Sequence, residues 1–251
     1  MKVRVFRTAR EAARAAAGAL AAQLAHKPAS VLGLPTGRTS LAVYDELVRL
    51  HQAGDADFAA AHTFNIDEFT GLASKDKRSY CAFMQKHLFS RVNLPHGHVH
   101  FLDGDAAIPD VECERYESEI AALGGIDFML LGIGGNAHIG FNEPGRVLQQ
   151  RTHRVRLALE TRRANASLFG GRLDKVPKNA MTMGVGTLLQ ARNIVLIATG
   201  RSKARPVASM FSGRITTEQP ASLLQLHGAV EVILDLPAAE KLPQSGFDAE
   251  L

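Results

Sequence analysis

The chain has 251 residues, of which 46% are hydrophobic and 22% charged, and it carries a formal net charge of +4. This composition is typical of a globular protein, and no apolar run reaches the ~20 residues of a membrane-spanning helix. The two cysteines, Cys81 and Cys113, form no C-x-x-C pair. That pattern excludes a disulfide scaffold and indicates a reducing, cytoplasmic compartment.

Short apolar runs alternate with longer helical patterns along the whole chain. The expected strands are Val3–Phe6, Val31–Leu34, His62–Phe64, Phe128–Leu131, Ile194–Ala198 and Glu231–Leu234. The expected helices between them are Ala12–Ala25, Ser40–Leu50, Tyr80–Leu88, Val111–Leu123 and Ser202–Phe211. This alternation predicts one α/β domain over residues 1–251, with a Rossmann-like parallel sheet and helices on both of its faces.

The second expected strand leads into a loop that opens a helix, Pro35-Thr36-Gly37-Arg38-Thr39-Ser40. Backbone N–H groups and hydroxyls at a helix N-terminus form an anion site. Thr36, Gly37, Arg38 and Thr39 are therefore candidate anion-binding residues. The loop is not a Walker P-loop, because the G-x-x-x-x-G-K-[ST] spacing is missing.

Three further strand exits deliver polar side chains. Asp67 follows the third strand, His138 and Glu143 follow the fourth across a glycine turn, and Lys203 follows the fifth. Because the carboxyl ends of strands in an open α/β sheet meet in one crevice, we expect these groups to share a site with the anion loop. A histidine there can move protons near neutral pH, and a nearby carboxylate can orient it.

Each of these residues also has a plainer interpretation, which the pattern leaves open. Asp67 could cap a helix or pair with a cation, and His138 with Glu143 could belong to a hydrogen-bonded surface loop. No metal is expected, because the spacing of His138 and Glu143 fits no zinc pattern.

Two other patterns are set aside. Gly132, Gly134 and Ala137 match a G-x-G-x-x-A dinucleotide fingerprint, but they lead to Pro144 rather than into a long helix. The histidines at 96, 98 and 100 are assigned a structural role, because Pro95 and Gly97 predict a turn there.

The segment from about 151 to 179 breaks the alternation, because it is rich in Arg and Lys and lacks a strong apolar period. We interpret this segment as a mobile lid over the site. A pair of surface helices is the alternative.

Together these segments resemble the glucosamine-6-phosphate deaminase (isomerase) family of sugar-phosphate isomerase-like α/β proteins, over nearly the whole chain. The resemblance rests on residues Leu32-Gly33-Leu34-Pro35-Thr36-Gly37, Phe64-Asn65-Ile66-Asp67-Glu68-Phe69, Gly134 to Pro144, Val176 to Thr187 and Leu224-Gln225-Leu226-His227. It implies conversion of glucosamine 6-phosphate and water into fructose 6-phosphate and ammonia, without a cofactor.

The resemblance also implies a role for each polar strand exit. His138, oriented by Glu143 with Asn136 beside it, would open the sugar ring. Asp67 would move the proton from C2 to C1. The phosphate would be held by residues 36–39 and by Lys203.

The chain departs from the best-known pattern of the family in four places. Asn136 stands where many relatives have Asp, so the tuning of His138 is expected to be weaker. Arg38 replaces the second glycine of the anion loop and Ser167 replaces a lid arginine, so Arg38 is expected to supply the missing cation. His153 replaces an arginine of the allosteric pattern, and that pattern's C-terminal tyrosine region is missing. We therefore expect hyperbolic saturation without activation by N-acetylglucosamine 6-phosphate.

Three alternatives stay open beside the deaminase: action on another aminosugar phosphate such as galactosamine 6-phosphate, a 6-phosphogluconolactonase, and a non-catalytic sugar-phosphate-binding protein. The segment Phe141-Asn142-Glu143-Pro144 favours the deaminase.

The expected partner is an aminosugar phosphate, which suits the mild positive charge. No nucleic acid is expected, because no basic stripe is interleaved with aromatics, and no membrane is expected. A homo-oligomer stays open, because the family includes monomers and hexamers.

Overall fold

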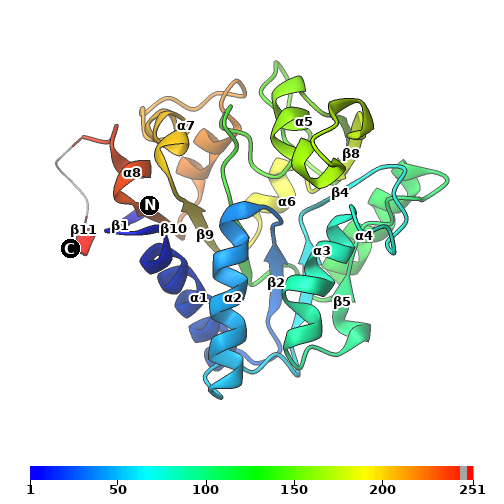
Figure 1. Ribbon diagram of the computed structural model, residues 1–251, viewed down its shortest axis with the longest axis horizontal. Coiled ribbons are helices and arrows are strands. Elements are labelled where there is room, and N and C mark those ends of the chain that lie inside the picture. The colour runs from blue at the N-terminus through cyan, green and yellow to red at the C-terminus, as the bar shows by residue number, and fades with distance from the viewer. Residues whose placement is uncertain (244–247, 251) are drawn as a thin grey trace.

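The polypeptide forms two sheets in the computed structural model, which describes residues 1–243 and 248–250 (Figure 1). All pairings in the eight-stranded sheet are parallel, and its strand order is β11-β1-β10-β9-β6-β2-β3-β5. Its strands are β1 Lys2–Phe6, β2 Val31–Leu34, β3 His62–Asn65, β5 Val99–His100, β6 Phe128–Leu131, β9 Asn193–Ala198, β10 Val230–Asp235 and β11 Asp248–Glu250. The prediction of an α/β fold with a parallel sheet is confirmed.

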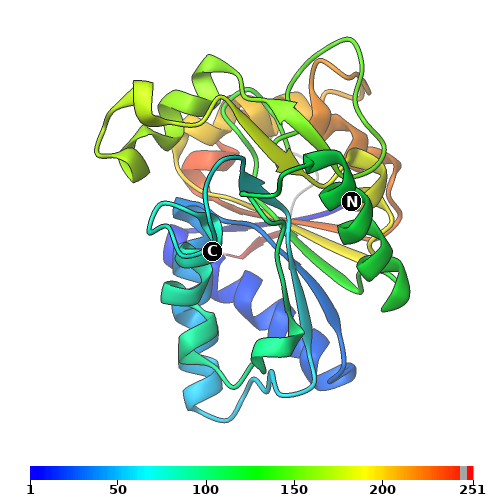
Figure 2. The ribbon, with the colours of Figure 1, turned by 90° about the vertical axis from the view of Figure 1, so that its right-hand side faces the viewer.

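Helices cover both faces of this sheet. They are α1 Ala9–His26, α2 Arg38–Gln52, α3 Tyr80–His87, α4 Pro109–Ala122, α5 Leu159–Asn165, α6 Val185–Leu189, α7 Ala204–Met210 and α8 Leu236–Ala239. One apolar core joins the sheet to α1, α2 and α3, and a second joins it to α4, α6, α7 and α8. Figure 2 shows the blue and cyan helices below the sheet and the orange helices above it. No helix of the described residues is both long and apolar enough to cross a membrane.

The six expected strands are all present, and four of them are one or two residues longer than expected. Helix α1 also begins earlier, because Thr8 and Glu11 form a capping box that satisfies its first N–H groups. The expected helix Ser202–Phe211 divides into a 3₁₀ turn, Arg201–Lys203, and helix α7.

A second, antiparallel sheet was not expected from the sequence. It has the order β4-β8-β7 and consists of β4 Asp67–Phe69, β8 Asn179–Thr182 and β7 His153–Arg156. The chain passes from β3 of the large sheet to β4 of the small sheet through a bend at Ile66. Strand β7 lies in the segment 151–179, so this segment contains a paired strand besides α5 and two 3₁₀ turns.

The segment 151–179 also buries apolar side chains, although it has no regular apolar period. Leu157, Phe169 and Val176 pack in a third core, whose other members come mainly from β4, α3 and β8: Phe69, Leu72, Tyr80, Phe141 and Ala180. In Figure 1, α5 lies beside β4 and β8 at the upper right, above β2. The segment is thus packed against the part of the molecule that carries Asp67.

The histidine-rich turn has a packing role. His98 and His100 stack near His62, with ring centroids 4.0 Å and 5.4 Å from it, and His98 Nδ1 bonds to the carbonyl of Ala61. Within the described residues no group of three or more potential ligands could hold a metal ion.

Candidate active site

The loop after β6 is shaped to hold a histidine ring. Gly134 N–H donates to the His138 carbonyl at 2.9 Å, and Ala137 N–H donates to the Gly134 carbonyl at 3.1 Å. Ala137 has a φ of 66°, a left-handed conformation that costs a non-glycine residue about 1 kcal/mol or more. A side chain at Gly134 would collide with the His138 ring, since its Cβ would lie 2.4 Å from ring atoms. Glycine is therefore required for the ring to lie where it does.

Glu143 connects this loop to His138 and to the segment 151–179. Its Oε2 accepts a hydrogen bond from Asn136 Nδ2 at 2.8 Å and lies 3.3 Å from His138 Nδ1. Its Oε1 accepts from the N–H of Ala158 at 3.2 Å, just before α5. Because Nδ1 faces this carboxylate, Nε2 is the imidazole nitrogen left for a ligand; it has no hydrogen-bond partner among the described residues.

The charge of Glu143 follows from these contacts. Burial raises its pKa, but the hydrogen bond and charge of His138, together with Thr161 and Asn136, outweigh burial and bring the pKa to about 2. Glu143 is therefore ionised at neutral pH and acts only as an acceptor. It holds the His138 ring in one orientation.

Asp67 has the opposite electrostatic environment. Only 7% of its surface is exposed, and burial with the nearby charge of Glu68 raises its pKa to about 8. Burial also raises the pKa of Glu68 to about 7, although three backbone N–H groups oppose this shift. These donors are Phe69, Tyr80 and Cys81, at 2.8, 3.0 and 2.9 Å. They favour the ionised form of Glu68. The negative charge of Glu68 in turn makes Asp67 harder to ionise.

Packing around Phe141 connects the loop that carries His138 and Glu143 to the strand that carries Asp67. The Phe141 ring centroid lies 6.4 Å from that of His138 and 5.7 Å from that of Phe69, two residues after Asp67. The N–H of Phe141 donates to Thr182 Oγ1 at 3.0 Å, and Thr182 is the strand partner of Asp67. The loop with His138 is thus fastened to the strand with Asp67.

The anion loop lies at the start of α2. Gly37 precedes the helix with a φ of 125° and no side chain caps it, so the first N–H groups of the 15-residue helix remain available. Thr36 and Thr39 are half-buried. Arg38 is exposed and forms no ion pair with any described residue.

Lys203 contacts the loop that carries His138. Its Nζ donates to the carbonyl of Ile133 at 2.7 Å, beside the glycine turn that carries His138. Burial lowers the pKa of Lys203, and the charge of Glu160 partly opposes this effect. Two N–H donors of the ammonium group remain for a ligand.

Sequence reasoning missed three residues of the segment 151–179 that reach the site. Thr161 Oγ1 lies 3.4 Å from His138 Nδ1, Asn165 Oδ1 accepts from Tyr80 OH at 3.0 Å, and Glu160 Oε1 approaches Gly135 so closely that a Cβ there would lie 2.6 Å away. Their only signal was the location after the His/Glu loop, because α5 has just seven residues.

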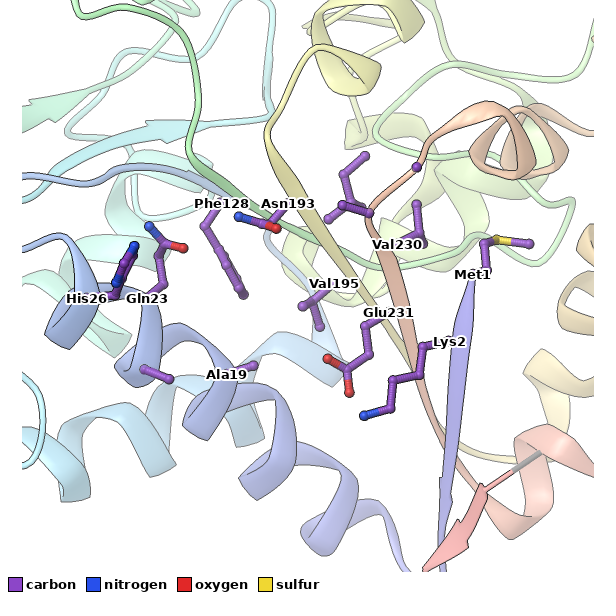
Figure 3. A pocket seen from close by; sticks show the side chains of 14 residues that line it. Met1, Lys2, Ala19, Gln23, His26, Phe128, Asn193, Val195, Val230 and Glu231 are labelled. Carbon is purple, nitrogen blue, oxygen red and sulfur yellow. The ribbon is translucent and has the colours of Figure 1, made fainter.

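One pocket lies at the opposite edge of the sheet, and a smaller one lies beside the loop that carries Glu143. A pocket of about 510 Å³ lies at the amino ends of β6, β9, β10 and β1, lined by Gln23, His26, Asn193 and Glu231 among others (Figure 3). It contains none of the expected site residues. A smaller pocket of about 230 Å³ reaches Glu143 from the side of β7 and contains His153, Arg154 and Arg156.

Comparisons with known proteins agree with this geometry. Residues 6–233 match the family described as glucosamine-6-phosphate isomerases/6-phosphogluconolactonase. The chain is 42% identical to glucosamine-6-phosphate deaminase 2 of Bacillus subtilis, over 98% of this chain and 100% of the relative. It is 45% identical to the glucosamine-6-phosphate deaminase of Bacillus velezensis, over 95% and 99%.

Solved structures give the same result. A monomeric glucosamine-6-phosphate deaminase superposes with a TM-score of 0.93 at 41% identity, covering 96% of this chain and 100% of that one. A 6-phosphogluconolactonase of Trypanosoma brucei shares the fold, with a TM-score of 0.73 at 20% identity and coverage of 96% and 98%. The chain belongs to the glucosamine-6-phosphate deaminase family.

Proposed function

We propose that this protein is a glucosamine-6-phosphate deaminase that converts glucosamine 6-phosphate and water into fructose 6-phosphate and ammonia. The observation that carries this proposal is the pairing of two carboxyl groups with opposite environments, Asp67 with a raised pKa and Glu143 with a lowered one. Such pairs divide acid and base work in one site. Relatives named as this enzyme cover nearly the whole chain.

Ring opening is assigned to His138. The imidazole takes the proton of the anomeric hydroxyl and returns one to the ring oxygen, which a group with a neutral and a cationic form can do. Glu143 orients the imidazole at 3.3 Å from Nδ1, and Asn136 donates to Glu143 at 2.8 Å.

Isomerisation is assigned to Asp67. The carboxylate removes the proton from C2 and delivers one to C1, and a proton of the amine passes to the C1 oxygen, so that the C2 amine becomes an imine and the C1 aldehyde becomes a CH2OH group. Water then adds to C2, the carbon–nitrogen bond breaks, and ammonia leaves. No net oxidation occurs in these steps, and no cofactor is proposed. The phosphate would be bound by Thr36 to Thr39 and by Lys203.

The working unit is proposed to be one chain. The relative with a TM-score of 0.93 is described as monomeric. The free thiols Cys81 and Cys113 are in keeping with a cytoplasmic enzyme.

The direct test is incubation of the protein with glucosamine 6-phosphate, measuring ammonia and fructose 6-phosphate. We expect the two products in equal amounts. Galactosamine 6-phosphate and 6-phosphogluconolactone are tested in parallel; faster turnover of either would replace the proposed substrate. Tight binding of glucosamine 6-phosphate without product would identify a binding protein instead.

The raised pKa of Asp67 predicts an unusual pH dependence. A base must be ionised to take a proton, so kcat/KM should fall as the pH decreases through about 8 and should already be reduced at pH 7.

Asp67→Asn should lower kcat by roughly 10²- to 10⁴-fold with a modest change in KM. A wild-type acid limb centred near the ordinary aspartate value of about 4 would contradict this account.

Glu143→Gln keeps the shape of the side chain but removes its charge. The imidazole then loses the charged partner that orients it, so the pH dependence of kcat for the cyclic substrate should differ from that of wild type. The control is Glu114→Gln, which removes one charge from an exposed carboxylate on α4. Identical pH profiles for Glu143→Gln and wild type would exclude the pairing.

Arg38 is proposed to replace the lid arginine as a phosphate contact. Arg38→Gly should then weaken substrate binding by about 1.5–3 kcal/mol, the range for one charge-assisted hydrogen bond. Adding Ser167→Arg should restore much of this loss, because both cations would serve one anion. KM for wild type, the two single variants and the double variant forms a double-mutant cycle. Additive effects, or a KM of Arg38→Gly within about twofold of wild type, would contradict the proposal.

A further inference from the structure

Asn65 has a buried side chain that the fold itself does not use. It ends β3 with 1% of its surface exposed, and its Nδ2 and Oδ1 atoms have no hydrogen-bond partner among the described residues. Its backbone, in contrast, is fixed: its carbonyl accepts from Tyr116 OH at 2.7 Å and the residue pairs with Leu34 of β2. A buried amide without partners destabilises the fold, so such a group calls for a partner outside the regular structure.

Asp67, the proposed base, lies two residues further along, beyond the bend at Ile66. Its carboxyl group makes no hydrogen bond with any other described residue. The bend between them is held by Ile66, whose N–H donates to Leu34 at 3.1 Å and whose carbonyl accepts from Met183 at 2.8 Å. The two Cα atoms lie at most about 7 Å apart, a span that one water molecule between amide and carboxyl can bridge.

The other polar groups around Asp67 are already committed. The titratable groups that interact with it are Glu68 on β4, Tyr44 on α2, Tyr80 on α3 and Tyr116 on α4. The three tyrosine hydroxyls donate to other acceptors, namely the carbonyl of Pro35, Oδ1 of Asn165 and the carbonyl of Asn65. Glu68, which accepts three backbone N–H groups, offers no donor in its ionised form. The amide of Asn65, in contrast, is a donor without a hydrogen-bond partner among the described residues.

An amide matches the chemistry of a base that changes its protonation state. In each turnover Asp67 passes from carboxylate to carboxylic acid and back, so its neighbour must first donate and then accept. The Asn side chain offers an N–H donor and a carbonyl acceptor on the same carbon. We propose that Asn65 is a positioning residue for Asp67: through one bridging water, Nδ2–H supports the carboxylate and Oδ1 supports the protonated carboxyl group. This inference rests on the proposed function.

The test replaces Asn65 by Leu, which has a similar shape and no polar atoms. The melting temperature should be unchanged or higher, because an unsatisfied amide has been removed. Turnover should fall by about tenfold or more, with KM nearly constant. The acid limb of kcat/KM should move upward by about one to two pH units, as expected when a carboxylate loses one hydrogen bond.

Thr63→Val is the matched control. Thr63 lies on the same strand two residues before Asn65, is fully buried, and has a hydroxyl that also lacks a partner among the described residues. Its replacement should leave the pH profile as in wild type. An equal shift in both variants, or a wild-type profile for Asn65→Leu, would overturn the proposal.

Two further measurements cover the remaining outcomes. If Asn65→Leu does not fold, Asn65→Ser is compared with Asn65→Ala, and equal activity of the two would overturn the proposal. The titration of the Asp67 carboxyl is also followed by carbon-13 NMR in wild type and variant, which requires no activity. If the wild-type protein does not act on glucosamine 6-phosphate, the proposed function is refuted. If the wild type is active but Asp67 titrates identically in wild type and Asn65→Leu, only this inference is refuted.

Discussion

The half-buried carboxylate of Glu143 makes the contacts on which the arrangement of the site depends. It touches Asn136 and His138 on its own loop and the N–H of Ala158 at the start of α5. Removing one of these donors would leave a half-buried charge with fewer hydrogen bonds, which costs more than the same loss at an exposed group. The same contacts that keep Glu143 ionised therefore join the loop with His138 to the segment 151–179.

The second carboxyl group, that of Asp67, shows how strongly the surroundings determine the pKa of a side chain. Glu143 has donors on both oxygen atoms, whereas Asp67 has a neighbouring negative charge and buried tyrosines whose hydroxyls point to other acceptors. One aspartate and one glutamate, with similar ordinary pKa values, thereby end up on opposite sides of neutrality. The fold achieves this by placing β4 in a separate small sheet, so that the residue after the bend at Ile66 enters a region closed by α3 and the third core.

Much of this could be predicted from the sequence, because continuous apolar runs such as Phe128–Leu131 identify buried parallel strands and glycine turns identify their exits. Asp67, His138, Glu143 and the loop 36–39 follow from that logic. The small sheet could not be predicted, since β4 and β7 have three and four residues with alternating or charged patterns. Thr161 and Asn165 were missed for the same reason: a seven-residue helix has too little periodicity to place its side chains. Asn65 was invisible as a functional candidate, because an amide at a strand end is notable only once its neighbours are known to be committed elsewhere.

The central claim is that a nearly enclosed carboxyl group carries the proton from C2 to C1. It is tested most directly with glucosamine 6-phosphate deuterated at C2, by measuring deuterium at C1 of the fructose 6-phosphate formed early in the reaction. With Asp67 only 7% exposed, part of the label should travel with the acid group and appear at C1. Complete loss of label to water at all temperatures and pH values would contradict the account, because it would indicate a base in free exchange with solvent.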